Sequence, residues 1–586
     1  MIKKLLKCVG QYKLPSVLTP IFIALEVIME VIIPLYMGKL LDDGINGRGG
    51  EGDMPYILKT GVVLAVFCVM SLIFGALAGK YAAEASGGFA KNLRKKMFYN
   101  LQSFSFSNID KFSVASLVTR LTTDVSNLQN SYQMCIRIAV RSPMMLVFSV
   151  LMAVKVNAKL SLVFVCIIPV LAFGLFYIVS HAHPIFERVF KTYDKLNRVV
   201  SENLHGIRVV KSFVREEKEK EKFEETSTQI YNDFVRAEKY LAFNGPIMQF
   251  SSYLAMILLS WFGAKIIVSS YGMPDAMTTG SLFVMLTYSM QILMNLMMLS
   301  MIFVMLTMSK ASARRVCEVL DEESNIKNPE NPVYEVKDGS IEFDSVGFSY
   351  SGEKDKLCLS DISFKIESGE TVGIIGVTGS SKTSLVQLIP RLYDITKGSV
   401  KVGGRDVREY DIRTLRDEVA MVLQKNVLFS GTIKENLRWG NENATDEEIK
   451  EVCRLAQADG FINEFPDGYD THIEQGGTNV SGGQKQRLCI ARSLLKKPKI
   501  LILDDSTSAV DTKTDALIRM AFKNYIPETT KIIIAQRTAS VEHADKIILL
   551  EGGKIVGFGN HETLLANNGI YKEVYESQTK GGRDNG

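Results

Sequence analysis

Histidine and cysteine are scarce in this sequence, and its positive and negative charges nearly balance. The 586-residue chain has 6 histidines and 8 cysteines, and its formal net charge is only +4. The cysteines, from Cys8 to Cys489, are scattered without the paired C-x-x-C spacing of metal and redox sites. We therefore expect no disulfide framework. The balanced charge also disfavours nucleic acid as a partner, because nucleic-acid-binding proteins carry a strongly basic face.

The N-terminus shows no sign of a cleaved signal peptide. Residues Met1–Ser16 are basic and amphipathic, but no small-residue cleavage site precedes the first long apolar run. Repeats of solenoid period are also lacking, which disfavours a stacked-repeat architecture.

Long apolar runs, in contrast, are abundant in residues 1–318, in a chain that is 47% hydrophobic. A helix that crosses a membrane needs about 20 mostly apolar residues. Any single run could be a buried core helix, but six in succession with few internal charges favour a membrane domain. The six predicted spans are Val17–Met37, Val62–Leu77, Ile136–Val154, Leu160–Val179, Pro246–Val268 and Ser281–Met308.

Basic residues are distributed unevenly between these spans. The short connections 46–53 and 269–280 contain one arginine between them, whereas the long segments 80–130 and 180–243 are rich in lysine and arginine. The lysines of 155–159 are a mild exception. Because lysine and arginine accumulate on the cytosolic side, we predict a multi-pass protein of the plasma membrane with both termini in the cytosol. We also expect the helices to continue past the bilayer.

The composition changes after Cys317. Residues 319–337 are polar, contain two Asn-Pro pairs and are typical of a linker. In residues 338–579, short β-rich runs alternate with amphipathic helical stretches, which predicts an α/β domain. Residues 580–586 are expected to be disordered. The predicted strands are Ile341–Tyr350, Thr371–Ile375, Val419–Leu423, Ile500–Leu503, Lys531–Ala535 and Lys546–Leu550.

The strand at Thr371–Ile375 leads into a glycine-containing loop and then a helix. The loop is close to the phosphate-binding pattern G-x-x-x-x-G-K-[ST], in which backbone N–H groups surround phosphates, the lysine reaches the terminal phosphates and the last hydroxyl binds Mg²⁺. Taken alone, the segment could also be an ordinary strand-to-helix turn. Its residues are Gly376, Val377, Thr378, Gly379, Ser380, Ser381, Lys382, Thr383 and, at the start of the helix, Ser384.

Two further motifs follow this loop. Residues 500–503 form an apolar strand that ends in the carboxylate of Asp504, which suits a second Mg²⁺ ligand. The pentapeptide Val480-Ser481-Gly482-Gly483-Gln484 lies between them and precedes a predicted helix.

In these motifs and their order, the chain resembles half-transporters of the ATP-binding-cassette (ABC) exporter family over essentially its whole length. The resemblance implies six long transmembrane helices of the type IV exporter fold, followed by an α/β P-loop ATPase domain that uses ATP and Mg²⁺. It identifies Gln424 as a residue near the metal and the attacking water. It identifies Tyr350 as the aromatic that stacks on adenine, and residues 508–511 as the D-loop.

The resemblance also implies that two such domains face each other head to tail. The signature residues Ser481, Gly482, Gly483 and Gln484, with Asp511 of the D-loop, would then contact the ATP held by the partner. Short coupling helices would lie near Ser105–Lys111 and Phe213–Lys218. They would pass the motion of the ATPase domains to the membrane helices.

Three positions depart from the family pattern. Asp505 stands where the family has a catalytic glutamate, Gln536 where it has a histidine, and Ser381 where the loop has a glycine. A carboxylate that is one carbon shorter can cost ~10²-fold in rate. We therefore predict a degenerate site, as in one subunit of a bacterial heterodimeric multidrug exporter whose partner supplies the intact glutamate and histidine. A homodimer with two slow sites is the alternative.

Polar residues inside the predicted spans are candidates for substrate contact. Glu26 and Glu30 lie one turn apart in the first span, and intramembrane carboxylates are rare and often functional. If they face the central cavity, lipophilic cations could neutralise them. The competing account is an internal partner such as Arg137 or Arg141, although we expect both arginines to lie nearer the cytosolic end. The sixth span contains Gln291 and Asn295, and also Met294 and Met298 among its eight methionines. Methionine adapts to varied ligands but also fills packing gaps.

Together these patterns predict a subunit that exports hydrophobic or amphipathic, multidrug-like solutes through the lipid bilayer. Lipid or peptide export is an alternative. A non-transporting subunit that only senses nucleotide is another.

Overall fold

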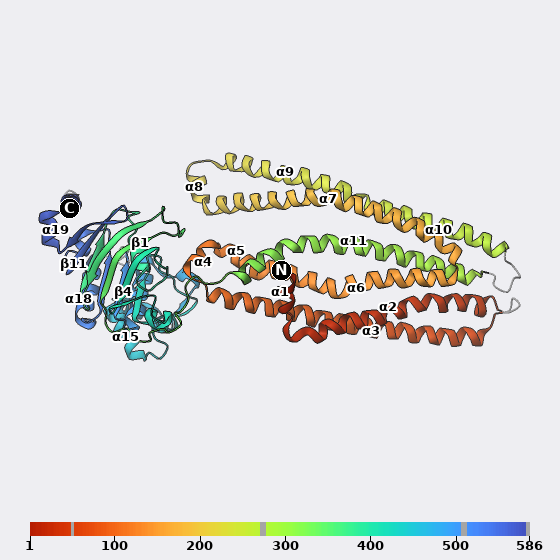
Figure 1. Cartoon of the computed structure of the whole chain (residues 1–586), viewed down its shortest axis with the longest axis horizontal. Coiled ribbons are helices and arrows are strands. Elements are labelled where there is room, and N and C mark those ends of the chain that lie inside the picture. The colour runs from red at the N-terminus through yellow and green to blue at the C-terminus, as the bar shows by residue number, and fades with distance from the viewer. Residues whose placement is uncertain (48–51, 270–276, 506–511, 582–586) are drawn as a thin grey trace. The chain divides into compact units, whose positions relative to one another are not determined.

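The computed structural model describes residues 1–47, 52–269, 277–505 and 512–581 (Figure 1). The chain divides into two compact units. The first contains Met1–Gln102 and Ser113–Glu322, and the second contains Ser103–Phe112 and Glu323–Gly586. A ten-residue segment from the membrane half of the sequence thus groups with the second unit.

The first unit consists of long helices, and six stretches of its described residues are long and apolar enough to cross a membrane. The six predicted spans are therefore confirmed. The longest helix, α3 (Met54–Gln102), has 49 residues. At about 1.5 Å per residue it exceeds twice the ~30 Å hydrocarbon core of a bilayer, as predicted. The other helices are α1 (Ile2–Lys7), α2 (Lys13–Lys39), α5 (Val114–Thr119), α6 (Val125–Val156), α7 (Ala158–His205), α8 (Ile207–Ser212), α9 (Glu216–Ala242), α10 (Asn244–Ser269) and α11 (Thr279–Asp321).

Small residues and backbone-directed hydrogen bonds hold α2 against α11. A Cβ atom on Gly38 would lie 3.1 Å from the carbonyl oxygen of Gly280, so neither position has room for a larger residue. The backbone N–H of Gly280 donates to Asp42 Oδ1 at 2.8 Å, and the hydroxyl of Tyr288 donates to the carbonyl of Val31 at 2.7 Å. Close contact through small residues replaces the hydrophobic effect, which is absent between helices in lipid.

The second unit is built on two main sheets. The first is antiparallel, with the order β2-β1-β4-β5. The second has the order β12-β11-β3-β10-β9-β6, and all of its neighbouring pairs are parallel except β11 with β12. The strands are β1 (Ile341–Phe348), β2 (Leu359–Ile366), β3 (Thr371–Ile375), β4 (Lys397–Val402), β5 (Arg405–Asp406), β6 (Val419–Val422), β9 (Ile500–Asp504), β10 (Thr530–Ile534), β11 (Lys546–Glu551) and β12 (Lys554–Gly559), with a separate pair β7 (Gly431–Thr432) and β8 (His472–Ile473).

Each of the six predicted strands is present, but sequence analysis missed β2, β4 and β12. β2 and β4 mix buried residues with exposed or partly buried ones, and β12 alternates exposed with partly buried residues. Each contains a lysine at an exposed position, so none has a continuous apolar run. The two-residue strands β5, β7 and β8 were missed as well. The helices of this unit are α4 (Phe106–Lys111), α12 (Lys382–Gln387), α13 (Ile412–Glu418), α14 (Ile433–Arg438), α15 (Asp446–Leu455), α16 (Asp459–Glu464), α17 (Gly482–Leu495), α18 (Thr512–Tyr525), α19 (His561–Asn567) and α20 (Gly569–Gly581). The rest of the predicted tail lies outside the described residues.

Candidate nucleotide site

The parallel sheet brings the predicted site residues to one edge. Strands β3, β10, β9 and β6 are neighbours in that order and run parallel, so their carboxyl ends lie together. The phosphate loop follows β3, Gln536 follows β10, Asp504 and Asp505 end β9, and Gln424 is exposed just after β6. Ligands of open α/β sheets bind at this edge.

The phosphate loop is tightly constrained at its first glycine and strained near its end. A Cβ on Gly376 would lie 2.1 Å from the carbonyl oxygen of Leu550, so only glycine fits there. Gly379 has φ +87°, which glycine adopts without strain. Ser381, however, has φ +68° and lies in the left-handed region. A residue with a Cβ atom in this conformation costs roughly 1–2 kcal/mol, a cost that the glycine of the family pattern avoids.

Lys382 lies across the loop. Its Nζ donates to the carbonyl oxygens of Gly376 at 2.7 Å and of Val377 at 3.0 Å. Burial lowers the pKa of Lys382, while the charges of Asp504 and Asp505 oppose this shift. Bound phosphate oxygens would satisfy the same ammonium group and favour its charged form.

Thr383 and Asp504 form a fitting site for Mg²⁺. Asp504 is 2% exposed, accepts a hydrogen bond from the Thr383 hydroxyl, and leaves its buried Oδ2 without a hydrogen-bond partner among the described residues. Burial, followed by the nearby charge of Asp505, raises the pKa of Asp504. A divalent cation supplies the missing partner for the carboxylate and the positive charge that such a site requires.

Two of the three departing residues contact each other. Gln536 Nε2 donates to Asp505 Oδ2 at 2.8 Å. Asp505 has φ +48°, and its N–H donates to the Ile534 carbonyl at 3.1 Å. Gln578 of α20 donates in turn to the Gln536 carbonyl at 2.9 Å, so the pair is held from the backbone side.

Tyr350 lies half-exposed at the end of β1. Its side chain is the candidate adenine platform, and its hydroxyl hydrogen-bonds with the Ser384 hydroxyl at 2.8 Å. The bond ties the ring to the phosphate loop, because Ser384 follows Thr383 directly. The remaining loop residues, Val377 and Thr378, are exposed, whereas Ser380 is buried.

The signature pentapeptide forms the N-terminus of α17. The Ser481 hydroxyl accepts the N–H of Gln484 at 3.3 Å, and Gln484 Oε1 accepts the N–H of Ser481 at 2.8 Å. This reciprocal cap leaves other N–H groups of the first turn, at Gly482 and Gly483, available to an anion. Asp511 and the D-loop lie outside the described residues.

In the membrane unit, the two carboxylates have an internal partner. Arg141 Nη2 lies 2.6 and 2.7 Å from the two carboxylate oxygens of Glu30, and 3.6 Å from Glu26 Oε1. Arg141 therefore reaches both carboxylates of α2 from α6. The contact favours the internal-partner interpretation of the pair.

In α11, the polar residues Gln291 and Asn295 form hydrogen bonds, whereas Met294 and Met298 are exposed. Gln291 Oε1 accepts a hydrogen bond from Ser149 at 3.2 Å, and Asn295 Nδ2 donates to the Gln291 carbonyl at 2.8 Å. Met294 and Met298 are 67% and 48% exposed, and they share a helix face with further exposed methionines. Those neighbours are Met290, Met297 and Met301.

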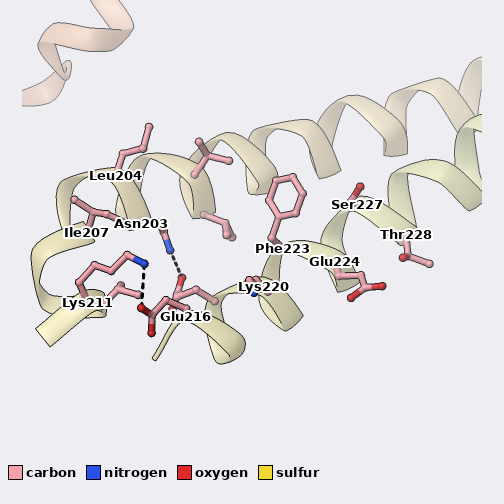
Figure 2. A pocket seen from close by; sticks show the side chains of 14 residues that line it. Asn203, Leu204, Ile207, Lys211, Glu216, Lys220, Phe223, Glu224, Ser227 and Thr228 are labelled. Atoms are coloured by element: carbon pink, nitrogen blue, oxygen red, sulfur yellow. Dashed lines mark hydrogen bonds and ion pairs between the residues drawn. The ribbon is translucent and has the colours of Figure 1, made fainter. Parts of the chain in front are cut away.

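The second predicted coupling segment forms the turn between α8 and α9. Phe213 and Val214 are strongly exposed there. Figure 2 shows a cavity beside the turn, lined by the end of α7, by α8 and by the start of α9, in which Lys211 and Asn203 reach toward α9. Lys211 bonds with Glu216 at 3.0 Å and Asn203 with Glu219 at 3.2 Å.

Sequence analysis missed one residue beside the site, Tyr393. It lies near the end of the segment that follows the phosphate-loop helix, where its hydroxyl donates to Asp110 Oδ2 at 2.6 Å. A buried tyrosine needs a hydrogen-bond partner, but the partner is separated from it by more than 280 positions in sequence. No local pattern could have identified the pair.

The chain is similar to known proteins in both of its parts. Residues 17–297 match the transmembrane region of ABC transporters, and residues 359–508 match the ABC transporter family. An uncharacterised ABC transporter ATP-binding protein of Bacillus subtilis (strain 168), YfiB, is 36% identical over 98% of both chains. An uncharacterised relative from Mycobacterium tuberculosis (strain ATCC 25618 / H37Rv), Rv1273c, is 36% identical over 94% of this chain and 93% of its own.

Among solved structures, a bacterial Atm1-family ABC exporter with ATP bound has the same fold. It superposes with a TM-score of 0.80, covers 97% of this chain and 98% of its own, and is 22% identical in sequence. The match confirms the predicted fold of a six-helix membrane domain followed by a P-loop ATPase domain. On the strength of these matches, the chain belongs to the ABC transporter family and joins a transmembrane region to an ATP-binding domain in one polypeptide.

Proposed function

We propose that this chain is one subunit of a heterodimeric ABC exporter and that its own nucleotide site is degenerate. The carrying observation is the hydrogen bond between Gln536 and Asp505. In the family pattern these positions hold a histidine and a glutamate that act on the terminal phosphate and the attacking water. Here a shorter carboxylate is engaged by a neutral amide, so this site binds ATP and Mg²⁺ but turns ATP over slowly.

The signature motif supports a division of labour between the subunits. Ser481 caps α17, and the first turn of that helix is exposed. We assign this N-terminus to the γ-phosphate of ATP held by a different half-transporter, which supplies the intact glutamate and histidine. The exposed Phe213 and Val214 suit docking against that partner's ATPase domain, because exposed apolar side chains at a helical turn are otherwise unfavourable in water.

For the substrate, we propose a hydrophobic or amphipathic solute of the multidrug type. This assignment rests on the exposed methionine face of α11, because flexible methionine side chains adapt to varied apolar shapes. Gln291 and Asn295 border that face as polar contacts. Glu26 and Glu30 are placed at the edge of the path and not as freely charged cation ligands, because Arg141 neutralises Glu30. The protein is proposed to reside in the plasma membrane with both termini in the cytosol.

Steady-state ATPase activity tests the proposal. The purified chain alone, reconstituted in lipid, should hydrolyse ATP slowly, and co-purification with its native partner should raise the rate by about 10²-fold or more. Fast hydrolysis by the chain as a pure homodimer would contradict the heterodimer. Sequencing the co-purified partner checks whether it has glutamate and histidine at the two equivalent positions.

A regulatory subunit that senses nucleotide without transport is the second candidate, favoured by the same degenerate site. ATP-dependent uptake of a lipophilic dye into inside-out vesicles distinguishes the two. Uptake that needs both chains supports the exporter. Partner-only vesicles that move the dye equally well would make this chain a sensor.

A further inference from the structure

Aromatic rings connect the adenine platform to helix α4. The ring of Tyr350 meets that of Tyr393 edge-on, with centroids 5.2 Å apart at 89°. Phe106 of α4 meets Tyr393 in the same manner, at 5.9 Å and 83°. Tyr393 thus contacts both Tyr350, the candidate adenine platform, and Phe106 of α4. Edge-to-face pairs of this kind have a preferred geometry, so a change at one ring is felt by the next.

A strong hydrogen bond completes the connection. The Tyr393 hydroxyl donates to the Asp110 carboxylate at 2.6 Å, and Tyr393 is only 8% exposed. Burial, and then the neighbouring carboxylate, raise the pKa of Tyr393, which keeps the hydroxyl protonated as a donor. Hydrogen bonds to an ionised acceptor are roughly twice as strong as neutral ones. Other bonds join α4 to the linker without involving the rings, among them those from Asn108 to the Glu323 carbonyl and to Asn325 Oδ1, and that from Asn325 to Ser107.

Tyr350 is held by three contacts and is still open to solvent. Its hydroxyl is held by Ser384, and its ring rests on Phe348 and Tyr393. The side chain is nevertheless 52% exposed. A base stacked on the exposed side would fix the orientation of the ring, and thereby that of Tyr393.

We propose that Tyr393 is a positioning residue that couples base stacking on Tyr350 to the docking of α4 through Asp110. Coupling of this kind is reciprocal, so a docked α4 strengthens base binding by the same factor by which the base strengthens docking. The triphosphate, held by the loop and Lys382, does not take part. The proposal rests on nucleotide binding at this site and adds a route by which base recognition reaches the segment joining α3 and α5.

The test compares two ligands on the full-length chain in lipid nanodiscs. Isothermal titration calorimetry measures binding of a non-hydrolysable ATP analogue and of inorganic tripolyphosphate, both with Mg²⁺. Tyr393→Phe removes the hydrogen bond, and Asp110→Asn replaces its ionised acceptor by a neutral amide oxygen. Each should weaken binding of the ATP analogue about threefold to tenfold, the factor expected for the loss of one hydrogen bond or of the charge that strengthens it. Tripolyphosphate, which has no base, should bind with unchanged affinity. The double variant should lose no more than Tyr393→Phe alone, because both changes act on the same bond.

Ser107→Ala is the matched control, since it removes a bond of α4 outside the ring cluster and should leave both affinities unchanged. Equal affinities of wild type, Asp110→Asn and Tyr393→Phe for the ATP analogue would overturn the coupling. Equal losses for both ligands would also overturn it, because they would indicate general damage to the loop. A wild-type chain that binds neither ligand would overturn the nucleotide site itself, and the coupling with it.

Discussion

At the residue scale, three side chains set the character of the nucleotide site. Ser381 has a left-handed backbone conformation, and Gln536 donates a hydrogen bond to Asp505. Sequence analysis identified all three from the family pattern, but neither the sign of φ at Ser381 nor the contact within the pair could be read from the pattern. Both depend on how β9, β10 and the loop meet at the sheet edge. The Gln536 amide donates to one oxygen of the Asp505 carboxylate.

Ser381→Gly is predicted to stabilise the protein. The change removes roughly 1–2 kcal/mol of left-handed strain, offset by ~0.5–1 kcal/mol for the added freedom of glycine in the unfolded chain. We expect a net gain of up to about 1.5 kcal/mol in the free energy of unfolding, measured as a rise in the midpoint of thermal unfolding of the ATPase domain within the full chain. Thr378→Gly is the control, because Thr378 is exposed and has no positive φ to relieve. Equal destabilisation by both changes would show that Ser381 is unstrained.

At the element scale, the helix N-termini of α12 and α17 serve two different nucleotides in the proposed dimer. Sequence periodicity predicted the six spans and the core strands well, because continuous apolar runs mark both. It missed β2, β4 and β12, because lysines and other polar residues interrupt their apolar residues. These strands are recognised only by their pairing with neighbouring strands. It also could not show that α4 packs with the ATPase domain, since the contact between Asp110 and Tyr393 is not local.

The division between the two helices predicts an asymmetry between two substitutions in the heterodimer. Ser481→Arg places a bulky cation over the first turn of α17, removes the cap and blocks the partner's γ-phosphate. Steady-state ATP hydrolysis should fall by about 10²-fold or more, as with the loss of other transition-state donors. Lys382→Ala, in contrast, damages a site that is already slow and should cost less. The opposite order in a coupled-enzyme ATPase assay would mean that the catalytic and degenerate sites have been assigned to the wrong chains.

At the scale of the whole molecule, one polypeptide joins a six-helix membrane domain to an ATPase domain. In the proposed function, the signature motif of that ATPase domain is intact and its catalytic pair is altered. The intact signature and the altered catalytic pair are separate features of the same fold, so they can be changed independently. The central claim is that Asp505 and Gln536 limit the rate of ATP hydrolysis at the nucleotide site of this chain. Thr383 and Asp504, the proposed Mg²⁺ ligands, lie beside each other, so the proposed defect is confined to the catalytic pair and Ser381.

The most direct measurement is therefore the ATPase rate of the chain alone, before and after Asp505→Glu and Gln536→His are introduced together. The longer carboxylate restores reach to the attacking water, and the histidine restores a contact to the terminal phosphate. We predict a rise in turnover of about 10²-fold, which Lys382→Ala added to the double variant should abolish. A double variant no faster than wild type, with ATP binding intact, would contradict the account, because the slow step would then lie elsewhere in the protein.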